Sequence, residues 1–152
     1  MTSNVGTCRP ETNLAEAAMM MWDGDCGVLP VVDDQGKVVA MITDRDIAIA
    51  AATNDRPASH IAVHEAMSGT VSFVLPDEDI RTALKTMRHD KIRRLPVLDH
   101  DGHLKGLLSV NDIVCRAEEA RGKTVPEITY EEAMGTIKAI CEHRSHHSEA
   151  KA

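Results

Sequence analysis

Residues of a kind that bind charged ligands interrupt two apolar stretches of the chain. The first insert, TDRD at 43–46, stands between apolar residues on both sides. A related insert, SVND at 109–112, stands at the corresponding point of a second apolar stretch. Two kinds of chemistry fit such a position, because the polar side chains either start a helix or hold a charged ligand.

Both inserts satisfy the pattern of a helix cap. Thr43 and Ser109 are each followed three residues later by an acid, Asp46 or Asp112, and such a pair can satisfy free backbone N–H groups at a helix start. Helix starts that follow buried strands also collect anions in α/β proteins. Arg45 lies inside the first insert, where a cation opposes the helix macrodipole. The cap and the anion site therefore both stay open.

Basic residues also enter the second apolar stretch. Lys91, Arg93 and Arg94 precede Leu95, where a buried strand is expected. Guanidinium groups at such a place favour a planar anion, and phosphate is the natural candidate. Pairing within the chain with some of its 24 acidic residues is the alternative.

The two inserts belong to two copies of one unit. GVLPVVDDQGKVVAMITDRDI at 27–47 aligns without a gap with RRLPVLDHDGHLKGLLSVNDI at 93–113, at the offset of 66 residues that separates Pro30 from Pro96. At this offset, ten of the 38 positions from 10 to 47 are identical to their counterparts. Chance does not explain that many matches, so the chain carries an internal duplication.

Each copy is predicted to fold as β-α-β-β-α. Extended segments at 5–8 and 71–75 are followed by a proline and then by apolar residues at the spacing of one helix face. Two apolar strands around an Asp-x-x-Gly turn come next, with the glycine supplying a positive φ. A second helix is expected from Asp46 and from Asp112 onward. The fold class is therefore α/β (α+β).

The repeat also divides the chain. The first unit covers 1–56 and the second covers 57–116, with a linker at 54–65 between the repeated patterns. The last part, 117–152, does not repeat and is expected to form a C-terminal helix and a polar tail. The helix is predicted within YEEAMGTIKAICEH, because its apolar residues recur at helical spacing.

Composition restricts the class of protein. The formal charge is −7, and no basic segment is long enough to follow a nucleic-acid backbone. No apolar run approaches the roughly 18 residues of a membrane span, and the first residues lack the features of a signal peptide. The four cysteines form no C-x-x-C pair and are expected to be free thiols. These features favour a cytoplasmic protein without nucleic-acid or membrane partners.

The tandem pattern LPV-x-D-x-x-G … (G/A)-x-(I/L)-(T/S)-x-x-D-I resembles a pair of CBS domains, named from cystathionine beta-synthase. The resemblance covers about residues 5–116, with both copies in register with the duplication. It implies two units related by a pseudo-twofold axis and packed through their sheets. It also implies clefts that bind adenosine ligands such as AMP, ADP, ATP or S-adenosylmethionine.

The resemblance implies a role for each residue of the two inserts. The aspartate that closes the motif usually binds the ribose hydroxyls, which implies this role for Asp46 and Asp112. A carboxylate suits it, because it only accepts hydrogen bonds and can take both protons of a cis-diol. Thr43 and Ser109 would lie beside the ribose and the phosphate.

Phosphate groups would meet basic residues that differ between the copies. Arg45 would serve one cleft, and Arg93 with Arg94 would serve the other. Asn111 stands where the second copy would carry the counterpart of Arg45. The two clefts are therefore expected to differ in affinity.

Adenine would lie against aliphatic side chains and backbone groups in such clefts. Val28, Thr7 and Ser72 are the wall positions that the resemblance suggests. The family's glycine before the motif is present as Gly106, whereas the first copy has Ala40. A methyl group there could narrow the approach to a ligand.

Metal binding and catalysis receive little support. His143 and His147 are four residues apart and could share a helix face, a geometry that can hold zinc, but the surrounding tail is polar. The chain has no Gly-x-Ser-x-Gly, no His-Glu-x-x-His, no Walker loop and no dinucleotide glycine fingerprint. We therefore expect neither a resident cofactor nor an enzyme.

The sequence thus predicts a regulatory module that binds an adenosine nucleotide, carries no attached catalytic domain and forms homodimers. The alternative is a ligand-free module for protein interaction, in which the two inserts are helix caps and nothing more. The protein partner is unknown on either interpretation.

Overall fold

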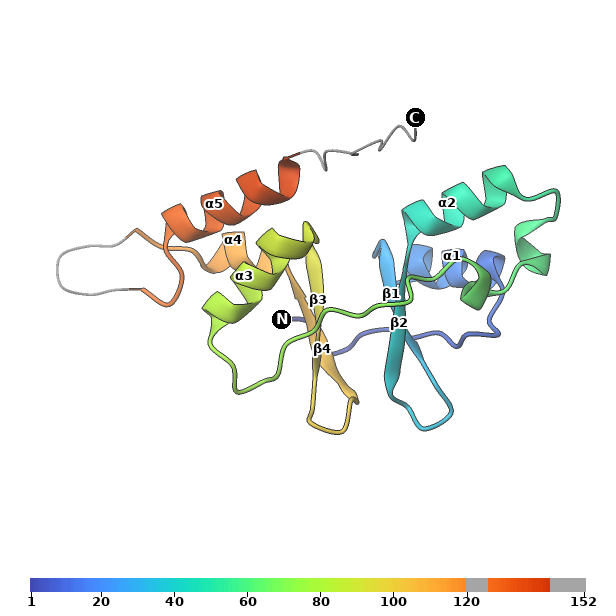
Figure 1. The fold of residues 1–152 in the computed structure, drawn as a ribbon, viewed down its shortest axis with the longest axis horizontal. Helices are drawn as coiled ribbons and strands as arrows, with labels where there is room; N and C mark the ends of the chain where they lie inside the picture. The colour runs from blue at the N-terminus through green and yellow to red at the C-terminus, as the bar shows by residue number, and fades with distance from the viewer. Residues whose placement is uncertain (120–125, 143–152) are drawn as a thin grey trace, which may run out of the picture. The chain divides into compact units, whose positions relative to one another are not determined.

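The computed structural model describes residues 1–119 and 126–142. These ranges hold a mixed α/β fold with helices, short 3₁₀ turns and two small antiparallel sheets, one formed by β1 and β2 and the other by β3 and β4 (Figure 1). The elements are α1 (Leu14–Asp23), β1 (Val28–Val32), β2 (Val38–Thr43), α2 (Asp44–Thr53), η1 (Ala58–His60), η2 (Val63–Glu65), α3 (Ile80–Asp90), β3 (Arg94–Leu98), β4 (Leu104–Ser109), α4 (Val110–Arg116) and α5 (Tyr130–Cys141).

The chain divides into two compact units. Of the described residues, one unit holds 1–77 and 96–108, and the other holds 78–95, 109–119 and 126–142. No helix in the described ranges is long and apolar enough to cross a membrane.

Both hairpins turn in the way that the Asp-x-x-Gly pattern predicts. Asp33 Oδ1 accepts hydrogen bonds from the backbone N–H groups two and four residues later, both at 2.9 Å. Asp99 Oδ1 does the same in the second copy, at 3.0 and 2.9 Å. Gly36 and Gly102 have φ values of +77° and +90°, which residues with a Cβ rarely adopt. The prediction of a positive φ at both glycines is confirmed.

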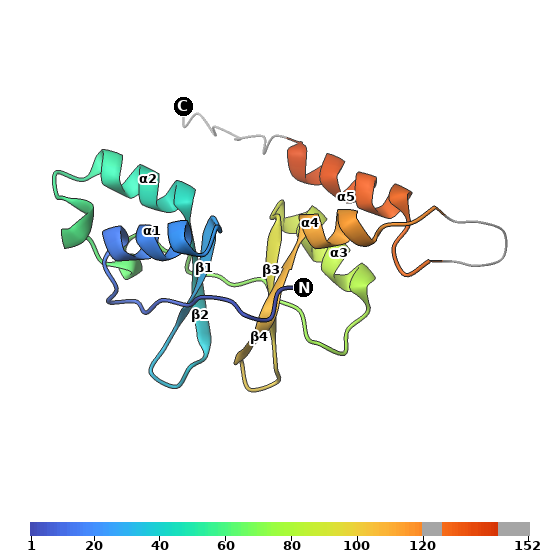
Figure 2. The same ribbon diagram turned by 180° about the vertical axis from the view of Figure 1, so that it is seen from behind.

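The first hairpin is covered by two helices. Figures 1 and 2 show α1 and α2 together on one side of β1 and β2. The predicted apolar face of α1 is buried at Leu14, Ala17 and Met21, where it joins a core that includes Leu29 and Ile42. Burying a side chain such as Leu or Ile stabilises the fold by about 1.5–3 kcal/mol. This core fixes the end of β2, where the first polar insert begins.

The extended segments before each helix are shorter than predicted. Segment 5–8 forms a single bridge, Cys8 with Val31, and segment 71–75 forms the bridge of Val74 with Val97. Each pairing consists of two backbone hydrogen bonds, for example Cys8 N to Pro30 O at 3.1 Å. The proline that follows each segment cannot extend a ladder, because it has no N–H to donate.

The helices after the inserts begin two residues earlier than predicted. α2 starts at Asp44 and α4 starts at Val110, whereas the pattern indicated Asp46 and Asp112. The reason is that the Thr or Ser before each helix is itself the N-cap. The acid three residues later is then the third residue of the helix.

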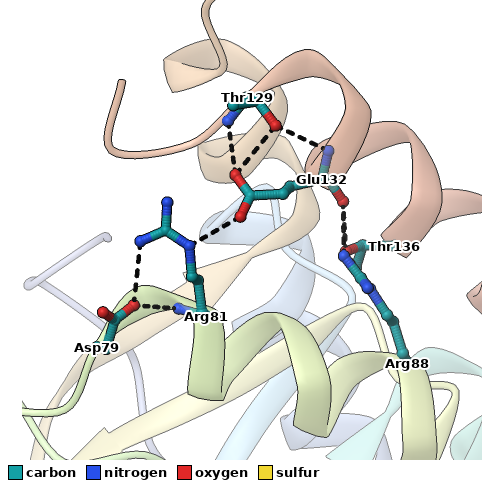
Figure 3. A network of polar contacts seen from close by, with 6 residues as sticks. All are labelled: Asp79, Arg81, Arg88, Thr129, Glu132 and Thr136. Atoms are coloured by element: carbon teal, nitrogen blue, oxygen red, sulfur yellow. Dashed lines mark hydrogen bonds and ion pairs between the residues drawn. The ribbon is translucent and has the colours of Figure 1, made fainter. Parts of the chain in front are cut away.

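The C-terminal helix is confirmed as α5, and it packs on α3 through a polar network (Figures 1 and 3). Arg81 Nε donates to Glu132 Oε1 at 2.8 Å, and Arg88 Nε donates to Thr136 Oγ1 at 2.9 Å. Glu132 Oε2 also accepts hydrogen bonds from the backbone N–H and the hydroxyl of Thr129, at 2.9 and 3.0 Å. Thr136 is fully buried between the two helices. Glu132 therefore caps α5 and ties it to α3 at once.

The pH dependence of α5 docking follows from Glu132. The hydrogen bond from the Thr129 backbone, aided by Arg81, holds the pKa of Glu132 below its ordinary value despite some burial. A lowered pKa in the folded state contributes stability above the unfolded pKa of about 4.3, and that stability is lost as the pH falls through the folded pKa. We expect Glu132→Gln to cost about 1 kcal/mol at pH 7. Urea unfolding of wild type and Glu132→Gln should show that their difference in free energy of unfolding shrinks between pH 5 and pH 3. A difference that stays constant over this range would contradict the lowered pKa of Glu132.

Candidate functional site

The first insert forms a complete capping box. Asp46 Oδ2 accepts hydrogen bonds from the backbone N–H of Thr43 at 2.9 Å and from its hydroxyl at 2.7 Å. The Thr43 hydroxyl accepts in return from the backbone N–H of Asp46 at 3.2 Å. Both side chains are half-buried, whereas Arg45 between them is exposed. The box thus fixes the orientation of the Asp46 carboxylate at the point where β2 ends and α2 begins.

The second insert repeats this geometry. Asp112 Oδ2 accepts from the backbone N–H and the hydroxyl of Ser109 at 2.9 and 2.7 Å, and the return bond to the Ser109 hydroxyl measures 3.2 Å. In both boxes the capping bonds engage Oδ2 alone, so Oδ1 takes no part in the cap. A carboxylate has about four lone-pair sites. The box therefore fixes the position of the Asp112 carboxylate at the start of α4.

A residue from the neighbouring strand region lies beside each box. The backbone N–H of Asp44 donates to Gly27 O at 3.2 Å, and the backbone N–H of Val110 donates to Arg93 O at 2.9 Å. Gly27 and Arg93 are counterparts in the duplication, 66 residues apart. The same backbone contact therefore brings a glycine to the first box and an arginine to the second.

Gly27 leaves room for the carboxylate of Asp44. A Cβ on Gly27 would lie 2.7 Å from Asp44 Oδ2, closer than two such atoms approach. Asp44 Oδ1 in turn accepts from the backbone N–H of Arg45 at 2.7 Å. Asp44 was not among the predicted site residues, although the alignment of Gly27 with Arg93 indicates that the two sites differ there. The first site thus carries two carboxylates and one guanidinium group.

The second site has the opposite balance of charge. Arg93 is exposed and Arg94 is half-buried at the start of β3, next to the box of Ser109 and Asp112. Asn111, the counterpart of Arg45, is exposed and uncharged. The segment beside this box therefore carries two arginines, whereas the box itself holds one carboxylate. Guanidinium groups bind phosphate oxygens through paired N–H donors.

The three proposed wall residues differ in exposure. Val28 is buried in β1, with 4% of its surface exposed, whereas Thr7 and Ser72 are half-buried. Their contact with adenine stays a prediction.

A close approach of the backbone, which the sequence did not reveal, explains why residue 106 is a glycine. A Cβ there would lie 2.8 Å from the carbonyl oxygen of Thr2 and from the Met1 side chain. Thr2 pairs with Leu107 through two backbone hydrogen bonds of 3.0 and 2.9 Å, so the chain crosses directly over this glycine. Ala40, at the corresponding position of the first copy, is buried in the core of the first hairpin.

The predicted zinc candidates His143 and His147 lie outside the described residues. Among the described residues, ligand atoms of Asp99, Asp101 and His103 lie within 4.8 Å of one another. The backbone N–H of His103 and then the Lys105 ammonium group, 3.0 Å from Oδ2, hold the pKa of Asp99 well below its usual range. Both carboxylate oxygens of Asp99 thus have partners within the chain, and the cluster is accounted for as a hairpin turn.

The four cysteines, all within the described ranges, are unpaired. Burial raises the pKa of Cys8 to about 11, so its sulfur stays a neutral thiol that packs in the core.

Comparison with known proteins agrees with the internal duplication. The sequence model of the CBS domain family matches residues 1–53 and 63–118, with one match for each copy. The chain belongs to the CBS domain family. The match covers both polar inserts, and the CBS pair accounts for most of the chain.

Similar CBS proteins include free-standing pairs. The CBS domain-containing protein YhcV of Bacillus subtilis is 32% identical over 137 residues, which cover 86% of this chain and 93% of YhcV. The CBS domain pair of protein MJ0100, solved with 5′-methylthioadenosine and S-adenosyl-L-methionine, matches with a TM-score of 0.68 and 28% identity over 76% of this chain and 89% of that one. CBSX2, solved with AMP, matches with a TM-score of 0.64 and 25% identity over 76% of this chain and 90% of that one.

Proposed function

We propose that this CBS pair is a regulatory sensor that binds an adenosine ligand and has no catalytic activity of its own. The observation that carries the proposal is the pair of boxes, Thr43 with Asp46 and Ser109 with Asp112. Each box holds a carboxylate in a fixed position at the start of a helix, directly after a strand. The adenosine ligands in the similar pairs support the same class of effector.

We further propose that the two sites prefer different adenosine ligands. Arg93 and Arg94 favour a phosphorylated ligand at the second site, such as AMP, ADP or ATP. Asp44 and Asp46 disfavour a phosphate at the first site and suit S-adenosylmethionine, whose sulfonium is a cation. Like charges within a few ångströms oppose each other, whereas opposite charges attract.

The working form in this proposal is a cytoplasmic homodimer without a resident cofactor. The unpaired cysteines are consistent with a reducing compartment. A sensor also needs a ligand that binds one state of the protein better than another, because affinity alone shifts no equilibrium.

The test is isothermal titration of nucleotide-free protein with AMP, ADP, ATP and S-adenosylmethionine. We expect micromolar binding of at least one ligand, with the nucleotide signal reduced by Arg93→Ala with Arg94→Ala. We expect the S-adenosylmethionine signal to be reduced by Asp46→Ala instead. No heat with any ligand from folded protein would overturn the proposal.

One observation favours a second function, protein interaction without a ligand. Both boxes are complete as caps, and a complete cap explains the Thr or Ser and the acid without any ligand. This alternative predicts that Asp46→Ala loses cap stability of about 1 kcal/mol and changes nothing else.

A further inference from the structure

Helix α1 presents an apolar stripe away from its core. Ala15, Met19 and Trp22 follow one another at i, i+4 and i+7, the spacing of one helix face. Met19 is 57% exposed and Trp22 is 80% exposed. The stripe is separate from the buried face of the same helix, so the core does not explain it.

Helix α5 carries a second stripe of the same spacing. Tyr130, Met134 and Ile137 again stand at i, i+4 and i+7, and Cys141 continues the row. Tyr130 is 61% exposed and Met134 is 64% exposed, whereas Ala133 and Thr136 on the other face are buried against the rest of the unit. Helix α5 therefore carries an exposed apolar stripe on the face that does not make the polar network with α3.

The duplication indicates what kind of element covers the α1 stripe. Ala15 and Trp22 are the counterparts of Arg81 and Arg88, 66 residues later. In the second copy these two arginines bind α5, which lies along that face of α3 (Figure 3). The same face of α1 carries apolar residues instead of arginines. It is therefore built to receive a helix with an apolar face.

We propose that the α1 stripe binds the outer stripe of α5 from a second copy of this chain. In a pair of chains each α1 would receive the partner's α5. The dimer would then contain two identical contacts, and both stripes of both chains would be covered. Tryptophan and tyrosine are the residues that most often anchor such interfaces. Two copies of charge −7 repel each other, and uncharged stripes offer the surfaces where contact avoids that repulsion.

The flanks of the stripes add one charged pair. Glu16 and Asp23 border the α1 stripe, and the exposed Lys138 borders the α5 stripe beside Glu131. In the proposed contact, the Lys138 ammonium group would face the carboxylates of Glu16 and Asp23 of the partner chain. The inference rests on the homodimer of the proposed function and names its interface.

The first test measures the dimer by sedimentation velocity over a range of concentrations. Trp22→Lys and Met134→Glu should each weaken the dimer by at least about 30-fold, because each change removes a residue from both copies of the contact. Phe73→Glu is the matched control, since Phe73 is 48% exposed but lies outside both stripes. Circular dichroism should show all three variants folded, because the altered side chains are exposed.

The second test mixes the two monomeric variants. In a mixed dimer one contact joins the introduced lysine to the introduced glutamate, and the other contact is wild type. The mixture should therefore form a dimer that neither variant forms alone. A contact of α1 with α1 predicts no effect of Met134→Glu and no rescue by mixing, and either result would overturn the inference.

The same experiments separate this inference from the homodimer itself. A dimeric wild type whose affinity neither variant changes would overturn the interface and leave the homodimer in place. A monomeric wild type at all concentrations would overturn both. Trp22 is the one tryptophan of the chain, so its emission should shift to shorter wavelength as the wild-type concentration rises. An unchanged spectrum across the dimerisation range would also contradict the contact.

Discussion

Replacing Asp112 by alanine should weaken AMP binding by about 10- to 100-fold. The backbone N–H and the hydroxyl of Ser109 hold Asp112 Oδ2, and the backbone N–H of Val110 in the same helix start donates to Arg93 O. Loss of a hydrogen bond to a charged group costs about 1.5–3 kcal/mol, which corresponds to that loss of affinity. The dissociation constants of wild type and variant from isothermal titration at one salt concentration are the measurement.

The chain supplies two matched controls for this prediction. Glu132→Ala removes the acid of a third capping box, Thr129 with Glu132, that has no role in the proposed sites. It should lower the free energy of unfolding by about 1 kcal/mol or more and leave AMP affinity unchanged. Asp46→Ala alters the other site and should leave AMP affinity within about twofold. If all three variants lose AMP affinity equally, the effect is one of stability and the ribose role of Asp112 is wrong.

The repeat made much of the fold predictable, because each copy supplies independent support for the other. The turns at Asp33 and Asp99 are an example, since an acid and a glycine three residues apart leave few turn geometries open. The predicted starts of α2 and α4 were wrong, because each helix begins two residues earlier than the prediction. A box motif indicates that a helix begins, but the position of its cap depends on which backbone N–H groups remain free.

The candidate site was predictable in its residue types and less so in its electrostatics. Thr43 with Asp46 and Ser109 with Asp112 form the expected boxes. The role of Asp44 depends on its approach to Gly27, a contact between residues 17 positions apart that no local pattern encodes. Gly106 is a similar case, because the chain that crosses it comes from the region of Thr2.

The docking of α5 illustrates a third limit. Helical spacing predicted the helix, but spacing alone does not say which face meets which neighbour. The structure places Thr136 against Arg88 and leaves Met134 exposed. Periodicity treats threonine as the more polar of these two residues and would have placed them the other way round. The polar network of Arg81 and Glu132 reverses that expectation, because charged hydrogen bonds fix the register of the helix.

Leu29→Ala should lower the free energy of unfolding by about 2–5 kcal/mol, the largest effect on stability that we expect. Leu29 is 1% exposed and belongs to the core that α1 and the first hairpin share. Its removal leaves a cavity that the hairpin can close only in part, since Leu14 and Ile42 in the same core are themselves fully buried. Val39→Ala is the control on the same hairpin, because Val39 is 38% exposed and its truncation should change the free energy by about 0.5 kcal/mol or less.

Urea unfolding followed by far-ultraviolet circular dichroism and by Trp22 emission measures both variants. Trp22 lies on α1, which packs on the core of Leu29, so the tryptophan signal reports the unit that the cavity affects. A loss below about 1 kcal/mol in Leu29→Ala would mean that this core repacks freely. The carboxylate of Asp46, at the end of the strand next to Leu29, would then not be held rigidly, and the ordered first site on which the proposed sensor depends would lose its structural basis.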